Sequence, residues 1–133
     1  MYYLRNSLFL IILSFTITTC INSENKALLV GSWKGAEWLI AGKPSDNDVG
    51  QVHFTFTRFG GYNSDIGGNN ERGTYILRDN KLYTTAEGQL EIMVEIEKLT
   101  KDSLVFNMNR SGQSETLTLI KEKKTSFTLS KFS

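Results

Sequence analysis

The chain has 133 residues, of which 40% are hydrophobic, and a formal net charge of +1 at pH 7. This length suits a single domain with one core. Apart from Arg5, which lies near the N-terminus, the chain has fourteen basic and fourteen acidic residues. A neutral chain lacks the basic stripe of a nucleic-acid-binding protein, so we expect no nucleic-acid partner.

The N-terminal segment, residues 1–19, has the pattern of a signal peptide. Arg5 precedes an apolar run over residues 8–17, which is too short to cross a bilayer because a spanning helix takes about 20 residues. The run ends at Ile17-Thr18-Thr19-Cys20, and Cys20 is the only cysteine. An apolar residue three positions before a cysteine resembles the lipobox of bacterial lipoprotein signal peptides.

This resemblance implies that cleavage leaves Cys20 as the first residue, acylated with palmitate-type chains. Residues 20–28 are then a tether, and residues 29–133 form the folded domain. Several acyl chains, at about 0.8 kcal/mol per buried methylene, would hold the protein firmly on a membrane. We expect a lipoprotein of the cell envelope, anchored in the outer membrane. The alternative is an ordinary secretory signal, which would give a secreted or periplasmic protein.

The domain begins with two predicted strands separated by a loop. Gly31-Ser32-Trp33 starts a strand that continues to about residue 40. Residues 41–50 include the lone proline and several Asn, Asp and Gly residues, which predict a loop. The second strand covers residues 51–59 and places three apolar residues on one face: Val52, Phe54 and Phe56.

Residues 60–70 are rich in Gly and Asn. They predict a short strand around Tyr62, followed by an irregular loop at the mouth of a barrel. At the other end of the chain, residues 125–132 alternate only weakly. They are predicted to form either a closing strand or a packed tail.

The strongest pattern lies between these regions, where five strands follow one another with tight turns between them. The predicted strands cover residues 73–78, 81–86, 89–99, 103–110 and 114–121. The turns are rich in Asn, Asp and Gly, which tolerate the positive φ of hairpins. A meander with one apolar face buries that face by closing on itself, which also removes its edges. The sequence therefore predicts an all-β fold, a small up-and-down antiparallel β-barrel of about eight strands without a helix.

Several motifs spread over residues 30–121 carry a family resemblance. They are Gly31–Trp33, Phe54-Thr55-Phe56, Gly73-Thr74-Tyr75, Lys81-Leu82-Tyr83 and Asp102-Ser103-Leu104. This set resembles the lipocalins and their calycin relatives, and more closely the short lipocalin-like lipoproteins common in Bacteroidetes. The resemblance implies that Gly31 and Trp33 close one end of the barrel and that Lys121 lies against the Trp33 ring. A cation over an indole contributes about 0.5–1 kcal/mol at an exposed site.

An eight-stranded barrel is either filled by its own side chains or holds one small ligand. The predicted lining is apolar: Phe54, Phe56, Leu90, Ile92, Val94, Leu104, Phe106, Met108, Leu117 and Leu119. We expect a non-catalytic protein that binds a small hydrophobic molecule there. The same residues would build a filled core. The alternative is therefore a solid barrel whose loops, at 41–50 and 60–70, contact a protein or glycan, with Trp38 and Tyr62 as anchors.

No combination of residues in the sequence predicts a catalytic, metal or cofactor site. His53 is the only histidine and has no neighbouring nucleophile or orienting group. Glu91, Glu95 and Glu97 share one strand face and are expected on a solvated exterior. The acidic loop that ends at Asp48 lacks the spacing and the closing glutamate of a calcium loop. The oligomeric state is not predicted by any pattern in the chain.

Overall fold

A computed structural model describes residues 19–123 of the chain, which form one helix, one 3₁₀ turn and nine strands. The helix is α1, Thr19–Leu29, and the 3₁₀ turn is η1, Val49–Gln51. The strands are β1 Gly31–Ile40, β2 Lys43–Pro44, β3 Val52–Phe56, β4 Gly61–Ile66, β5 Asn69–Arg78, β6 Lys81–Ala86, β7 Ile92–Leu99, β8 Ser103–Arg110 and β9 Gln113–Lys121.

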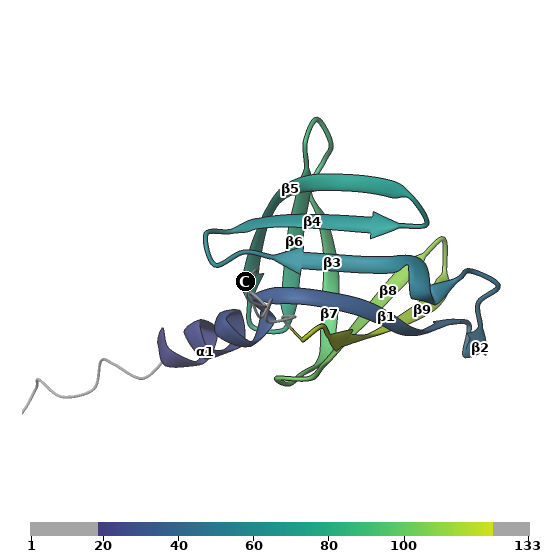
Figure 1. Cartoon of the computed structure of the whole chain (residues 1–133), viewed down its shortest axis with the longest axis horizontal. Helices are drawn as coiled ribbons and strands as arrows, with labels where there is room; N and C mark the ends of the chain where they lie inside the picture. Colours follow the sequence, from purple (N-terminus) through teal and green to yellow (C-terminus); the bar gives the residue numbers. More distant parts are fainter. Residues whose placement is uncertain (1–18, 124–133) are drawn as a thin grey trace, which may run out of the picture.

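Eight of the strands formed by residues 19–123 close into an antiparallel barrel (Figure 1). The order is β1-β3-β4-β5-β6-β7-β8-β9, and β9 pairs back onto β1. The short β2 pairs only with the end of β1, beside the barrel. Each strand is joined to the next by a short connection, as expected for an up-and-down meander. The predicted all-β fold and its strand number are confirmed.

The seam between β1 and β9 closes the barrel. It runs from Trp33 opposite Lys121 to Ile40 opposite Glu115, with a shift of register after Gly35. A side chain at Gly35 would collide with the backbone oxygen of Val49, because the turn at 49–51 lies against this part of β1. Gly35 therefore allows β1 to shift register and remain paired with its neighbours.

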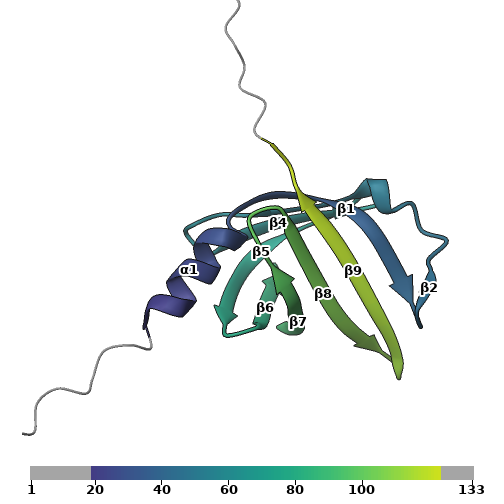
Figure 2. The ribbon, with the colours of Figure 1, turned by 90° about the horizontal axis from the view of Figure 1, so that it is seen from below.

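Helix α1 covers one end of the barrel, which we call the closed end (Figures 1 and 2). The prediction that the chain has no helix is wrong here. An eleven-residue helix is marginal by itself, so tertiary contacts rather than sequence propensity decide whether it forms. Those contacts are visible at its last turn, where Leu29 is fully buried and its carbonyl accepts a 2.8 Å hydrogen bond from Trp33 Nε1.

Lys121 joins the end of β9 to the end of the helix. Its Nζ lies 4.4 Å from the centroid of the Trp33 ring and donates to the carbonyls of Leu28 (3.1 Å) and Val30 (2.6 Å). Gly31 has a φ of 131°, and a Cβ there would lie 2.6 Å from Lys121 Cε. Glycine therefore leaves the space that the lysine occupies. Burial lowers the pKa of Lys121.

The closed end is filled by large side chains. Trp33, Leu29, Leu104 and Leu119 are all 0% exposed, so this half of the barrel is a packed core. Tyr75 belongs to the same core: its ring meets Phe56 edge to face, with centroids 5.2 Å apart, and its hydroxyl donates to the carbonyl of Thr57 at 2.6 Å. Burial raises the pKa of the Tyr75 phenol above its ordinary value.

The prediction for residues 60–70 is partly wrong. Instead of a short strand and an irregular loop, the chain forms β4 and the start of β5, joined by a tight turn at Gly67-Gly68. Both glycines have positive φ, 62° and 88°. The two glycines correctly indicate the turn. The residues around it are polar and show no strand pattern, and they form strands because they pair with neighbouring strands in the sheet.

Two predicted strands are also shorter than expected. The strand predicted over 51–59 ends at Phe56, and the one predicted over 89–99 begins at Ile92. The predicted closing strand or tail at 125–132 lies outside the described residues.

We predict that Lys121→Met destabilises the protein by about 1–3 kcal/mol. The variant keeps an apolar stem, but it loses the cation over Trp33 and leaves the two carbonyls without this donor. Chemical unfolding of the purified protein measures the difference. The matched control is Lys123→Met, an exposed lysine two residues along. Equal stability of the two variants would contradict the role given to Lys121.

We predict that the free energy of unfolding falls between about pH 9 and pH 11, and falls less steeply in Tyr75→Phe. Because the pKa of Tyr75 is raised in the folded state, its contribution is present below the unfolded-state pKa and lost as pH rises through the folded-state pKa. Lys121, whose pKa is lowered, acts in the opposite sense in both proteins, so the comparison cancels it. Parallel pH curves for the two proteins would show that Tyr75 has no such effect.

Candidate ligand-binding site

The barrel is hollow at the end away from α1, where a cavity of about 340 Å³ lies between the strands. Its apolar lining consists of Trp38, Phe54, Phe56, Ile66, Leu82, Ile92, Val94, Phe106, Met108 and Leu117. Its polar lining consists of Tyr62, Ser64, Asn69, Glu71, Thr84 and Arg110. Trp38 is late in β1 and pairs with Leu117 in the middle of β9, whereas Trp33 and Lys121 pair at the other end of the seam. The cavity therefore opens away from the helix.

Seven of the ten residues predicted to line the barrel interior line this cavity: Phe54, Phe56, Ile92, Val94, Phe106, Met108 and Leu117. Leu104 and Leu119 do not. Both point inward but lie at the closed end, fully buried in the packed core. Leu90 also lies away from the cavity and is 89% exposed, because β7 begins after it. Alternation along a strand predicts which face a residue takes, but not its depth along the barrel.

One wall of the cavity is apolar and comes from β1, β3, β8 and β9. Phe54 and Phe106 meet edge to face with their centroids 5.7 Å apart, an arrangement that aromatic pairs favour. Trp38 lies beside Leu117, its partner across the β1–β9 seam. Its indole Nε1 lies 3.4 Å from Glu115 Oε2, to which it donates. This wall offers ring faces and aliphatic side chains to a ligand.

The facing wall, from β4, β5 and β6, carries most of the polar lining, beside Ile66 and Leu82. Ser64 lies opposite Glu71 in the sheet register, and Tyr62 is the next inward residue on β4. Burial raises the pKa of the Tyr62 phenol, the charge of Glu71 raises it further, and a hydrogen bond with Thr84 opposes the rise. Polar groups on a cavity wall fix the orientation of a ligand that the apolar wall desolvates.

Arg110 lies at the rim of the cavity, at the end of β8. Its Nε is 3.6 Å from Glu115 Oε2, and the glutamate side chain is nearly buried whereas the arginine is largely exposed. Glu115 thus accepts a hydrogen bond from Trp38 and forms an ion pair with Arg110, which gives this buried carboxylate the partners it needs.

The sequence analysis missed most of the polar wall. Under the alternative of a solid barrel, Tyr62 and Trp38 were the expected anchors for a protein or glycan, but Tyr62 is only 5% exposed and both residues line the cavity. Tyr62, Ser64 and Ile66 alternate along β4, a signal that recognition of this strand would have given. Asn69 and Glu71 carried no such signal, because a polar residue on a strand usually faces solvent.

The other residues considered for chemistry lie on the surface. His53 Nδ1 is 2.8 Å from Glu122 Oε1, and both side chains are well exposed. The three glutamates of the β7 region, residues 91, 95 and 97, are exposed as predicted. Asp48 accepts from the backbone N–H of Gly50 and caps the 3₁₀ turn. Within residues 19–123, no group of three or more metal-binding side chains is present.

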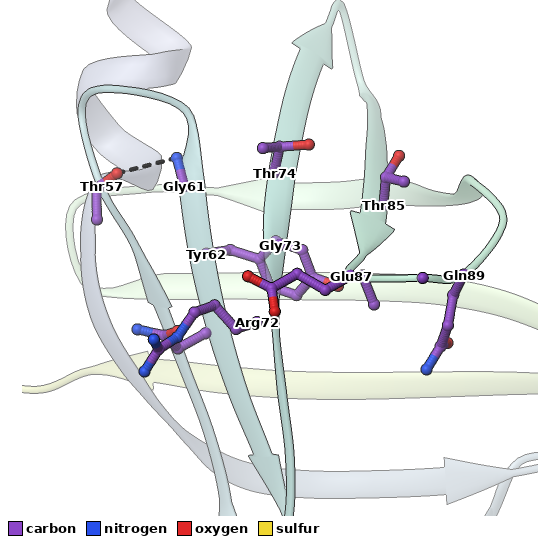
Figure 3. Close-up of a pocket in the computed structure, with 12 residues that line it drawn as sticks. Thr57, Gly61, Tyr62, Arg72, Gly73, Thr74, Thr85, Glu87 and Gln89 are labelled. Atoms are coloured by element: carbon purple, nitrogen blue, oxygen red, sulfur yellow. Dashed lines mark hydrogen bonds between the residues drawn. The ribbon is translucent and has the colours of Figure 1, made fainter.

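A second, broader depression of about 520 Å³ lies on the outside of the barrel (Figure 3). Arg72, Glu87 and Gln89 border it, and the hydrogen bond from Gly61 N to Thr57 Oγ1 lies at its edge. It is open to solvent, so it encloses a ligand less completely than the cavity does. The enclosed cavity is therefore the better candidate site.

Comparisons with known proteins agree with this architecture. A sequence profile of the lipocalin-like domain family matches residues 29–106, more than half of the chain. No curated protein matches the chain. The part of the chain that is described contains no helix of the length and apolar character needed to cross a membrane.

Two solved structures from Bacteroides share the fold. One is an uncharacterized protein from Bacteroides eggerthii, with 16% identity and a TM-score of 0.56 over 71% of this chain and 99% of that one. The other is a lipocalin-like protein from Bacteroides uniformis, with 17% identity and a TM-score of 0.51 over 68% of this chain and 96% of that one. These two likenesses show the shared fold, and the profile match over more than half of the chain shows that the chain belongs to the lipocalin-like domain family.

Proposed function

We propose that this protein is a membrane-anchored lipoprotein whose barrel binds one small hydrophobic molecule without catalysing a reaction. The cavity of about 340 Å³ is the observation that carries the proposal. Its volume falls near the lower end of the range for small-molecule sites, about 300–1,000 Å³. The lipocalin-like fold, which is generally a non-catalytic binding fold, supports the same conclusion.

The lining explains why an apolar molecule would enter. Phe54, Phe106 and Leu117 present ring faces and a branched side chain to the interior, and each Å² of apolar surface removed from water contributes about 25 cal/mol. Leu82 and Phe56 lie deepest and are almost fully buried, so they form the floor. The volume suits a compact molecule rather than a long acyl chain.

The proposed anchor is acylated Cys20, and its position is compatible with access to the cavity. Helix α1 begins at Thr19 and leads to the closed end of the barrel. A lipid on Cys20 would therefore attach the molecule by the end that carries Trp33. The mouth of the cavity, at the other end, would face away from the membrane and stay open to ligand.

We predict that Val94→Trp weakens binding of N-phenyl-1-naphthylamine by about tenfold or more. This apolar dye is neutral at pH 7 and fluoresces when it leaves water. Val94 is half-buried in the cavity wall, so a tryptophan there occupies the space the dye needs. Fluorescence titration of the purified full chain measures the affinity.

The matched control is Glu95→Trp, which adds the same side chain on the outer face of β7. It should bind the dye as the original protein does. Absence of dye binding by the original protein, or equal binding by both variants, would contradict the proposal.

We predict that Cys20→Ser abolishes metabolic labelling with a palmitate analogue and moves the protein from the membrane fraction to the soluble fraction. The thiol is the acceptor of the first acyl group, and loss of several chains removes most of the membrane affinity. Cell fractionation with the labelled fatty acid measures both effects. An unlabelled, soluble original protein would instead support the secretory alternative.

A further inference from the structure

The cavity has one charge without a counter-charge. Three ionisable side chains lie in or against it, apart from the tyrosine: Glu71, Arg110 and Glu115. Arg110 and Glu115 face each other at 3.6 Å and offset one another. No ion pair of Glu71 with a lysine, arginine or histidine is found among residues 19–123. The carboxylate of Glu71 therefore gives the cavity a net negative charge.

Glu71 is a half-buried residue of the cavity lining and lies opposite the buried Ser64 in the sheet register. The charge of Glu71 contributes to the raised pKa of Tyr62, a residue that is 5% exposed and lines the same space. The field at the polar wall thus favours a positive group.

The groups around Glu71 carry oxygen atoms that can accept hydrogen bonds. Ser64 lies directly across from it on β4, while Asn69 and Thr84 are its neighbours on the same wall. A protonated primary amine has three N–H donors and no acceptor. The polar wall therefore offers a carboxylate and further oxygens to an ammonium group, and charge-assisted hydrogen bonds of this kind are the strong ones.

The facing wall suits the rest of such a molecule. Trp38, Phe54 and Phe106 line it, and ring faces attract cations as well as apolar groups. An anionic ligand would meet a different environment. The guanidinium of Arg110 at the rim already faces Glu115, and Glu71 would repel a carboxylate.

We propose that the cavity selects compact apolar molecules that carry a protonated amine, with the ammonium group at Glu71 and the apolar part against Trp38, Phe54 and Phe106. This inference rests on the proposed function, because it specifies the class of molecule that the same cavity holds. The selected class is defined by charge and shape: a cationic head on an aromatic or branched apolar body.

Three probes that share an indole ring with a short substituent at C3 test the inference. At pH 7 tryptamine is cationic, 3-ethylindole is neutral and indole-3-propionate is anionic. Their dissociation constants for the purified full chain are measured by competition with N-phenyl-1-naphthylamine at low salt. We expect tryptamine to bind tightest and indole-3-propionate weakest.

Glu71→Gln, which keeps the shape of the side chain and removes its charge, should lower the preference for tryptamine over 3-ethylindole by about fivefold to tenfold. The matched control is Glu95→Gln, which removes one negative charge from the outside of the barrel and should leave the preference unchanged. A smaller effect of Glu71→Gln at high salt is also expected, because salt screens the interaction.

The outcomes separate this inference from the proposed function. If 3-ethylindole binds but tryptamine is not preferred, or if Glu71→Gln keeps the preference, the selection of amines is wrong and a cavity for neutral molecules remains. If neither the dye nor any indole binds, both the inference and the proposed function are overturned.

Discussion

The pairing of β1 with β9 is the constraint on which the rest of the molecule depends. Without it the meander would be an open sheet with its apolar face in water and two unpaired edges. One end of this seam holds Trp33 opposite Lys121, where the lysine joins β9 to the end of α1. The other end carries Trp38 opposite Leu117, which form part of the cavity wall. The packed closed end and the cavity are thus both formed along the same seam between β1 and β9.

The two halves differ because the inward residues differ in size. At the closed end the interior is filled by an indole and several leucines, all fully buried. At the other end, β4 and β6 place Ser64 and Thr84 in the interior. These two side chains are too short to fill the space between opposite sides of the barrel. An eight-stranded barrel is close to the limit at which its own residues can fill it. A few short side chains on one wall are therefore enough to leave a cavity.

Much of the fold was predictable from the sequence, because period-two alternation and turn residues are local signals. Phe54, Phe106 and Leu117 were assigned to the interior on that basis and do line the cavity. The sequence pattern did not predict features set by distant contacts. Helix α1 depends on contacts with Trp33 and Lys121. The position of Leu119 along the barrel depends on where the barrel closes. Glu71 faces the interior, although polar residues on strands usually face solvent.

A crystal structure of the purified protein soaked with N-phenyl-1-naphthylamine tests the central claim most directly, since it shows both the closure and the hollow. We expect β1 and β9 to be hydrogen-bonded along their length, and electron density for one dye molecule between Phe54 and Phe106. An interior filled by side chains, with the dye absent or bound outside the barrel, would contradict the account.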